Sequence, residues 1–392
     1  MKKRICFLMH MNHEINGYSD LVRGCEIILY NYSQFLIKKG YEPIWVLLAK
    51  KDLKIPRIFH KIPLFRIERK FTSELNPINF VALFLKLVKT LKKKNVEIVY
   101  TRVSSLGFIA GFACKITGSR FIFHVEDLEA DLTRTLTLEN FFWAYLRMFL
   151  LMLAQKGAVS MATVVITVSK TFKNFLVRNW HIPSVKVISL YEGVERRPQL
   201  SSPSHHNFPF SIVYLGGISK YDGLDVLLRA FQIVVKKNEN VGLVVATFVE
   251  EEKIVPFRRM CTYLGLDKNV RFVSSITGQV ARSLVRNSNI GVIPRRQTLS
   301  TNLTTSSVIF LYFSEGKPVI VPRLKAISEL VSEESSFYEP GNFNSLADTL
   351  IRLISDDKLR EKLRRYSLKM RDDFSREKMC EKLVKIIRSL PK

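Results

Sequence analysis

The chain has 392 residues, of which 47% are hydrophobic and 24% are charged. That length is too great for a single ordinary core and fits two domains, and the composition excludes a disordered chain. The formal net charge of +26 indicates anionic partners (nucleic acid, acidic lipid headgroups or phosphorylated ligands), unless it reflects only a basic surface that aids solubility.

The first half of the chain alternates segments typical of strands and helices. Buried strands read as short apolar runs, and helices show apolar residues at a spacing of three and four. Strand, helix and strand joined by short connections predict a parallel sheet covered on both faces. We expect strands at residues 4–10, 42–49, 96–102, 120–127 and 163–169, and helices at 21–39, 76–95, 106–117, 140–154 and 170–179.

Residues 196–210 interrupt this alternation, because they contain three prolines and several serines without apolar periodicity, which is typical of a linker. The alternation then restarts and ends in an amphipathic helix at about 374–390. The sequence therefore predicts two consecutive α/β domains. In the second we expect strands at 211–217, 241–248, 270–275, 290–294 and 318–322, and helices at 223–237, 255–265, 280–287 and 308–316.

Targeting signals and covalent cross-links are not evident in the sequence. Its five cysteines are far apart and form no CxxC pair, which favours a reducing compartment over a disulfide framework or a zinc site. The apolar run near the N-terminus is shorter than a signal peptide requires. The apolar stretch 141–153 is too short to span a bilayer and contains Arg147. We expect a cytoplasmic protein, with a peripheral place on the inner face of the membrane left open.

The order of several motifs resembles glycosyltransferase family 4. The turn "YEGVE" at 191–195 is similar to the end of that family's first domain, and "IVYLGGISKYDGLDVLLRAF" at 212–231 to the start of its second. The segment "FLYFSEGKPVIVP" at 310–322 looks like its donor-binding helix and the following strand. The resemblance covers nearly the whole chain, and the order of the segments is more specific than any one of them.

The resemblance implies a GT-B fold, with two Rossmann-like parallel-sheet domains that face each other across a cleft. The domains would comprise residues 1–195 on the acceptor side and 208–365 on the donor side, with the helix at about 374–392 crossing back to the first. It also implies a retaining transfer from a nucleotide sugar to a glycan or lipid-linked acceptor. We expect no cofactor and no metal, because residues 127–131 ("DLEAD") are not a DxD motif and the histidines near the N-terminus lack HExxH spacing.

Candidate site residues in the first domain follow two predicted strands. Gly17 follows the first strand, in the loop that would face the donor, although an ordinary turn also explains it. His124, Glu126 and Asp127 close the strand "FIFHVED", where the resemblance puts acceptor-side residues and where polar groups are placed to bind sugar hydroxyls. We assign His124 and Asp127 as catalytic candidates and Glu126 to the acceptor side. Asp127 could instead cap the helix that follows it.

Candidate donor contacts in the second domain depart from the family pattern. An Arg and a Lys that usually hold the diphosphate are replaced by Gly217 and Asp222, and two Glu positions are occupied by Leu311 and Leu303. Without a dedicated nucleophile, catalysis would rest on electrostatic stabilisation of the leaving diphosphate. Residues nearby in sequence could bind the donor instead, and we assign to this role Gly216, Gly217, Lys220, Arg295, Arg296, Thr304 and Thr305.

Two other function classes remain open. The missing donor contacts favour a non-catalytic scaffold or partner subunit of an active glycosyltransferase as the alternative. A nucleic-acid binder rests on charge alone, and we find no nucleic-acid motif and no GxGxxG or P-loop fingerprint. Residues 50–70 and the helix after them mix Lys and Arg with Ile, Leu and Phe. We expect this part of the first domain to contact an anionic membrane surface, unless it is a solvated loop and an ordinary amphipathic helix.

Overall fold

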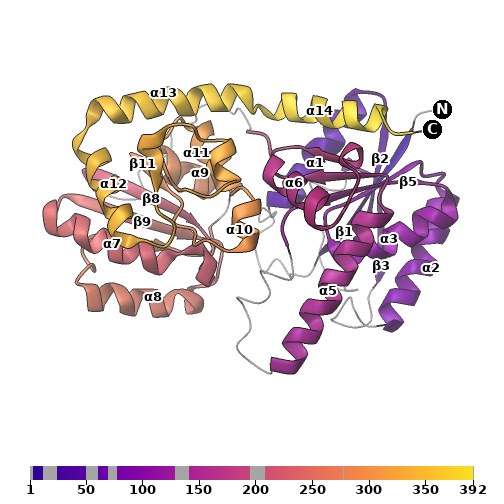
Figure 1. Cartoon of the computed structure of the whole chain (residues 1–392), viewed down its shortest axis with the longest axis horizontal. Helices are drawn as coiled ribbons and strands as arrows, with labels where there is room; N and C mark the ends of the chain where they lie inside the picture. The colour runs from indigo at the N-terminus through magenta and orange to yellow at the C-terminus, as the bar shows by residue number, and fades with distance from the viewer. Residues whose placement is uncertain are drawn as a thin grey trace. The chain divides into compact units, whose positions relative to one another are not determined.

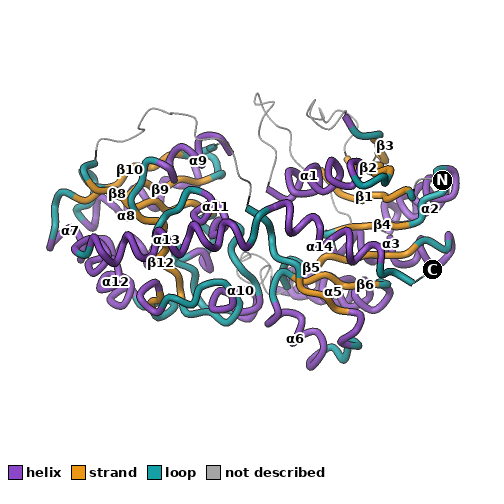
Figure 2. The backbone as a smooth tube through the Cα atoms, turned by 90° about the horizontal axis from the view of Figure 1, so that it is seen from above, coloured by secondary structure: helices purple, strands orange, loops and turns teal. Residues whose placement is uncertain are grey.

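The computed structural model describes residues 3–11, 24–49, 61–68, 77–128, 141–194, 208–276 and 278–391 (Figure 1). The chain divides into two compact units. Unit 1 comprises Met1–Tyr191 together with Cys380–Lys392, and unit 2 comprises Glu192–Met379. Each unit is built around one parallel β-sheet with helices on its faces (Figure 2). The predicted α/β class with two Rossmann-like sheets is therefore confirmed.

The sheet of unit 1 has seven parallel strands in the order β3-β2-β1-β4-β5-β6-β7. The central strands are almost wholly buried, as apolar runs in a sheet covered on both faces should be. All the strands run the same way, so their carboxyl ends meet at one edge. The strands are β1 (Arg4–Met11), β2 (Glu42–Ala49), β3 (Leu64–Glu68), β4 (Ile98–Thr101), β5 (Arg120–Val125), β6 (Val164–Thr167) and β7 (Val187–Ser189).

The helices of unit 1 form two layers, set by the direction in which the chain steps along the sheet. From β1 to β2 the chain moves toward β3, whereas from β3 to β4 and onward it moves toward β7. Right-handed crossovers therefore place α1 (Gly24–Lys38) on one face and α2 (Pro77–Lys93), α3 (Ser104–Thr117) and α5 (Phe141–Met161) on the other. Helix α6 (Lys170–Asn179) connects β6 to β7, and the end of α14 (Arg376–Arg388) also belongs to this unit.

The sheet of unit 2 has six parallel strands in the order β10-β9-β8-β11-β12-β13. Its apolar core includes residues of β8, β9, β11 and the helix α7. The strands are β8 (Phe210–Gly216), β9 (Val241–Thr247), β10 (Val270–Val273), β11 (Ile290–Val292), β12 (Val319–Pro322) and β13 (Phe337–Tyr338). The helices are α7 (Leu224–Lys237), α8 (Glu251–Leu264), α9 (Gly278–Arg286), α10 (Leu299–Leu303), α11 (Val308–Ser314), α12 (Phe343–Ser355) and α13 (Asp357–Asp373).

Several elements were not anticipated from the sequence. Strand β3 lies inside the basic segment that we had interpreted as a membrane contact, and it pairs along its whole length with β2. Much of that segment, residues 50–60 and 69–76, lies outside the described residues. Short strands such as β7 and β13 carry too few residues to show periodicity. The described part of the chain contains no helix that is long and apolar enough to cross a bilayer.

Candidate functional site

His124 lies at the carboxyl end of β5, buried beneath the edge of the unit 1 sheet. Its Nδ1 atom is 2.5 Å from the hydroxyl of Tyr100 on the neighbouring strand β4, and the two groups share a hydrogen bond. The side chain is only 1% exposed. Burial lowers the pKa of His124 well below its ordinary value, and the nearby Arg102 guanidinium lowers this pKa further. The imidazole is therefore neutral at physiological pH.

An ion pair joins the loops that follow β4 and β5. The guanidinium of Arg102, just beyond β4, is nearly inaccessible to solvent and pairs with the carboxylate of Glu126, just beyond β5. The Glu126 side chain remains one-third exposed. A buried cation thus holds a partly exposed carboxylate at this edge, where ligands of open α/β sheets bind. Sequence reasoning missed Arg102 and Tyr100, because neither residue type is unusual after a buried strand.

Asp127 is fixed through its backbone. Its carbonyl oxygen accepts a hydrogen bond of 2.7 Å from Nε2 of Gln155, which is buried on α5. This contact ties the loop after β5 to the helix that precedes β6. His124, Glu126 and Asp127 are therefore brought together at one edge of unit 1. Gly17, the fourth candidate in this unit, lies outside the described residues.

In unit 2, the loop after β8 folds around the carboxylate of Asp222. Oδ2 of Asp222 accepts a hydrogen bond of 2.9 Å from the backbone N–H of Ser219, and together the two residues form a capping box around one turn of 3-10 helix at Lys220–Asp222. A Cβ atom at Gly217 would lie 2.5 Å from this Oδ2 atom. Burial raises the pKa of Asp222, whereas Arg295 and the hydrogen bonds from Ser219 lower it. The acid is thus turned toward its own loop.

The loop after β8 interlocks with the loop after β11. Gly223 has a φ of +73°, and a Cβ atom there would lie 1.9 Å from the carbonyl oxygen of Pro294. The backbone N–H of Arg296 donates to the carbonyl of Tyr221 over 2.9 Å. The Arg296 guanidinium also pairs with the carboxylate of Asp225 in the first turn of α7. Main chain, and not only side chains, therefore fixes the distance between the two loops.

Arg295 lies beside this turn. Its charge acts on both Asp222 and Tyr214, and Tyr214 donates a hydrogen bond to the carbonyl of Gly217. Burial raises the pKa of Tyr214 well above its ordinary value, and the carboxylate of Asp222 raises it further. Arg295 is partly exposed, as are Arg296 and Gly217. The structure thus brings together the glycines and the two arginines that we had assigned to the donor. Lys220, in the same turn, is exposed.

The hydroxyl-rich segment after Arg296 has mainly local partners. Thr298 and Thr301 form a capping box at the start of α10, with hydrogen bonds of 2.7 and 3.1 Å. Thr304 is buried and donates to the carbonyl of Ser300, whereas Thr305 is partly exposed. Local bonds of this kind are what hydroxyl side chains at helix ends make in general. Thr305 is therefore the more accessible of the two assigned threonines.

Glu315, the acidic residue directly before the "GKPV" segment, pairs with two arginines of unit 2. Leu303 is buried and Leu311 is partly exposed. Neither side chain can accept a hydrogen bond. Glu315, four residues after Leu311, is 5% exposed and binds the guanidiniums of Arg282 and Arg286 at 2.8 and 3.0 Å. This carboxylate joins α9 to the end of α11. It therefore does not stand in for the missing acid at Leu311.

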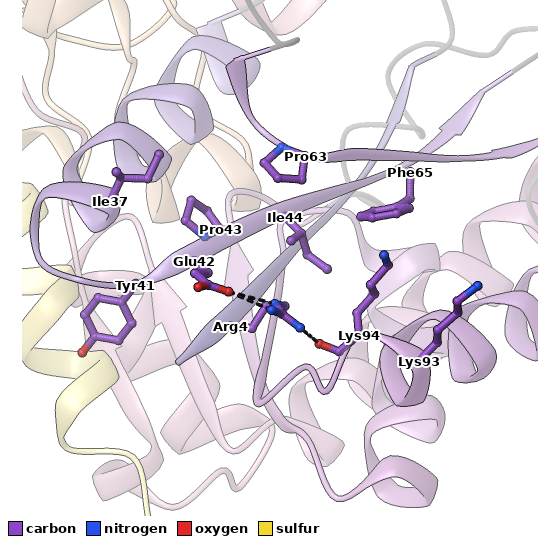
Figure 3. Close-up of a pocket in the computed structure, with 10 residues that line it drawn as sticks. All are labelled: Arg4, Ile37, Tyr41, Glu42, Pro43, Ile44, Pro63, Phe65, Lys93 and Lys94. Atoms are coloured by element: carbon purple, nitrogen blue, oxygen red, sulfur yellow. Dashed lines mark hydrogen bonds and ion pairs between the residues drawn. The ribbon is translucent and has the colours of Figure 1, made fainter. Parts of the chain in front are cut away.

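A pocket of about 510 Å³ lies at the opposite edge of the unit 1 sheet, where β1 and β2 begin (Figure 3). Arg4 pairs there with Glu42 over 2.8 Å, and Nζ of Lys94 lies 4.6 Å from the centre of the Phe65 ring. The carboxyl ends of the strands, with the candidate residues, are at the other edge. The lining residues are Arg4, Ile37, Tyr41, Glu42, Pro43, Ile44, Pro63, Phe65, Lys93 and Lys94.

Sequence comparison decides between the function classes that the site leaves open. Residues 22–197 match the family described as Glycosyltransferase Family 4, and residues 209–356 match the one described as Glycosyl transferases group 1. The chain belongs to family 4 of the glycosyltransferases. The resemblance found in the motifs is thereby confirmed, and the protein is a glycosyltransferase enzyme.

Individual relatives and solved structures match most of the chain. The capsular polysaccharide biosynthesis glycosyltransferase CapM of Staphylococcus aureus is 27% identical over 345 residues, which are 84% of each chain. The crystal structure of HepE from Anabaena in complex with UDP superposes with a TM-score of 0.74 at 18% identity, covering 100% of both chains. Sucrose-phosphate synthase from Thermosynechococcus elongatus gives a TM-score of 0.78 at 14% identity, over 99% of both. These structures show that the fold is GT-B.

Proposed function

We propose that this family 4 glycosyltransferase moves a sugar from a nucleotide-sugar donor to a glycan or lipid-linked acceptor, with retention at the anomeric carbon. Anabaena HepE, which has the same fold, was crystallised with UDP and with UDP-glucose, and CapM acts in capsular polysaccharide biosynthesis. The HepE complexes support a uridine nucleotide as the first donor to test. A peripheral position on the inner face of the membrane would suit a lipid-linked acceptor.

The observation that carries this proposal is the interlocked pair of loops at the carboxyl edge of the unit 2 sheet. Gly216 and Gly217 offer backbone without side chains, and Arg295 stands beside them with partial exposure. The backbone hydrogen bond from the Arg296 N–H to the Tyr221 carbonyl keeps the second loop beside the first. A cation on a fixed loop near bare backbone suits a diphosphate, because charged hydrogen bonds contribute about 1.5–3 kcal/mol each.

The two carboxylates near these loops are already engaged by other groups, which reduces their repulsion of an anionic donor. Asp222 is turned inward and accepts from the Ser219 N–H, and Asp225 is neutralised by Arg296. The charge left for a ligand comes from Arg295 and the exposed Lys220. In a retaining transfer without a protein nucleophile, the leaving phosphate takes the proton of the acceptor hydroxyl. Arg295 would then stabilise the negative charge that develops on the diphosphate.

We assign the acceptor side to the carboxyl edge of unit 1. Glu126 is one-third exposed and could accept hydrogen bonds from sugar hydroxyls, while Arg102 holds it in place. His124 is buried and neutral, so that it could position the neighbouring loop or, after a local movement, bind a hydroxyl. Asp127 is anchored through its carbonyl at the same edge and stays a further candidate.

Titration calorimetry with UDP and UDP-glucose tests the donor assignment directly. Changing both Arg295 and Arg296 to Ala should weaken the binding of UDP and UDP-glucose at least tenfold, because each substitution removes a charged donor near the loop. Arg258→Ala with Arg259→Ala removes the same number of charges from exposed positions of α8, where Arg258 pairs with Glu251, and should leave binding unchanged. Equal affinity in the double variant and the parent would refute the assignment. A parent that binds no nucleotide sugar would instead support the non-catalytic scaffold.

A further inference from the structure

The helix layer α2, α3 and α5 of unit 1 has a one-sided charge. Across these three helices the sequence has seven Lys or Arg residues and neither Asp nor Glu. By contrast, α1 and α14 both contain acidic residues, whereas α6 also has cations alone. A layer with cations alone attracts an anionic surface and repels a basic one.

The same layer exposes large apolar side chains to solvent. On α2, Val81 and Leu85 are 55% and 60% exposed, on the side opposite to the buried Leu83 and Leu87. On α3, which packs between the other two helices, Phe112 and Ile116 are also exposed. Side chains of this size are normally buried, and several on adjacent helices mark a contact surface.

The first half of α5 is the most apolar part of this surface. Helices α3 and α5 pack closely at Gly157, whose backbone lies against the ring of Phe108. From there α5 runs back beyond α3 (Figure 1), and between Tyr145 and Leu153 its only charged residue is Arg147. This stretch is exposed around about half of its circumference. The exposed apolar residues are Tyr145, Leu146, Phe149, Leu150 and Leu153.

We propose that α2, α3 and α5 form the membrane-docking face of the enzyme, with the first half of α5 inserted among the lipids of an anionic leaflet. The nine residues from Tyr145 to Leu153 rise about 13 Å along a helix, which enters one leaflet but does not cross a core of about 30 Å. Lysines such as Lys86 and Lys89 would meet the headgroups, and Arg147 would reach back to them.

A second copy of the chain is a poorer occupant of this face. Symmetric dimers use the same patch on both partners, so the seven cations would confront seven others without a single acid between them. The anionic leaflet satisfies both properties of the face at once, since its headgroups carry negative charge and its acyl chains accept apolar side chains.

The position of this face deepens the proposed function, on which this part of the inference rests. Helix α5 passes the carboxyl edge of the sheet, at which Glu126 and Asp127 lie, where its Gln155 binds the Asp127 carbonyl. A membrane contact through α5 would therefore bring the acceptor-side residues close to the headgroup layer. A sugar acceptor attached to a lipid would reach them without leaving the bilayer.

Vesicle flotation of the full chain tests the docking face. Binding to phosphatidylglycerol-containing vesicles at low salt should fall at least tenfold in Phe149→Ser with Leu153→Ser, and should lose its preference for anionic over phosphatidylcholine vesicles in Lys86→Glu with Lys89→Glu. Tyr263→Ser, at an 89% exposed residue of α8, and Lys236→Glu with Lys237→Glu, at the end of α7, are the matched controls in unit 2. Both controls should float like the parent.

Three results would overturn the proposal: a parent that does not float, controls that lose binding as much as the α2 and α5 variants, or a parent dimer that these variants convert to monomer while flotation persists. Sedimentation velocity measures the last of these. The α2 and α5 variants should keep the parent's UDP affinity, because all their changes are on exposed positions of unit 1. If the parent itself does not bind UDP, this result would refute the donor assignment alone, and the flotation result would still stand.

Discussion

A Cβ atom at Gly217 would lie 2.5 Å from Oδ2 of Asp222, which is closer than real Cβ contacts come. The two positions where this chain departs from the family's Arg and Lys are therefore one structural feature. Once Asp222 accepts the Ser219 N–H, residue 217 has no room for a side chain. An arginine at 217 would require the carboxylate to leave its turn.

A double-mutant cycle should reveal this coupling. Gly217→Ala should destabilise unit 2 by about 1–3 kcal/mol, because the new methyl group overlaps with a fixed carboxylate. In an Asp222→Ala background the same change should cost far less, since the obstacle is gone. Urea unfolding monitored by hydrogen exchange in β8 and α7 would measure all four proteins. Additive effects would show that the carboxylate moves aside freely.

The contact between Gly223 and Pro294 predicts a larger loss. Gly223→Ala should cost more than about 2 kcal/mol, because it combines a left-handed backbone with a Cβ at 1.9 Å from a carbonyl oxygen. Gly265 has a similar φ of +70° with no atom near its missing Cβ. Gly265→Ala should therefore show only the backbone cost of about 1 kcal/mol. Similar losses at both positions would mean that the two loops can separate.

Buried His124 predicts an acid-sensitive unit 1. Its folded-state pKa lies below the ordinary 6.5, so the unfolded chain binds the proton more readily. The stability of unit 1 should be complete above pH 6.5 and be lost as the pH falls from 6.5 toward the folded pKa. His124→Asn should flatten this dependence in thermal melts between pH 7.5 and 5, whereas replacing exposed His181 serves as the control. A parent slope retained in the variant would assign the effect elsewhere.

The carboxylate of Glu315 should contribute more to the free energy of unfolding than an exposed carboxylate that also pairs with two arginines. Glu315→Gln leaves Arg282 and Arg286 without a counter-charge, and we expect a loss of about 2–3 kcal/mol. Glu361 also binds two arginines, but on the surface of α13. Glu361→Gln should leave the urea midpoint unchanged. If both variants behave alike, burial does not strengthen the Glu315 pairs.

Long apolar runs allowed most of the fold to be predicted from the sequence. Strands such as β1 and β9 and the helix α7 carry their own burial pattern, so their type is visible without a partner. Strand β3 is different, because only Ile67 of its five residues is buried and basic residues surround it. What makes β3 a strand is its pairing with β2, which is a long-range contact.

The candidate site was predictable in its place but not in its interactions. Parallel strands put Glu126 and Arg295 at carboxyl edges, and the alternation of strands and helices is enough to locate those edges. Which acid meets which base depends on loop geometry. Asp222 stands where the resemblance implies a Lys on the diphosphate, and its carboxylate binds the Ser219 N–H three residues away. The domain boundaries and the individual roles of the site residues remain predictions.

The return of Cys380–Lys392 to unit 1 has a consequence for biosynthesis. Leu383, Ile387 and Leu390 are buried, yet they are synthesised after the whole of unit 2. Throughout synthesis of unit 2, a nascent unit 1 therefore lacks the apolar side chains that complete it. Unit 1 is therefore the part that a chaperone would have to protect until the segment after unit 2 has been made.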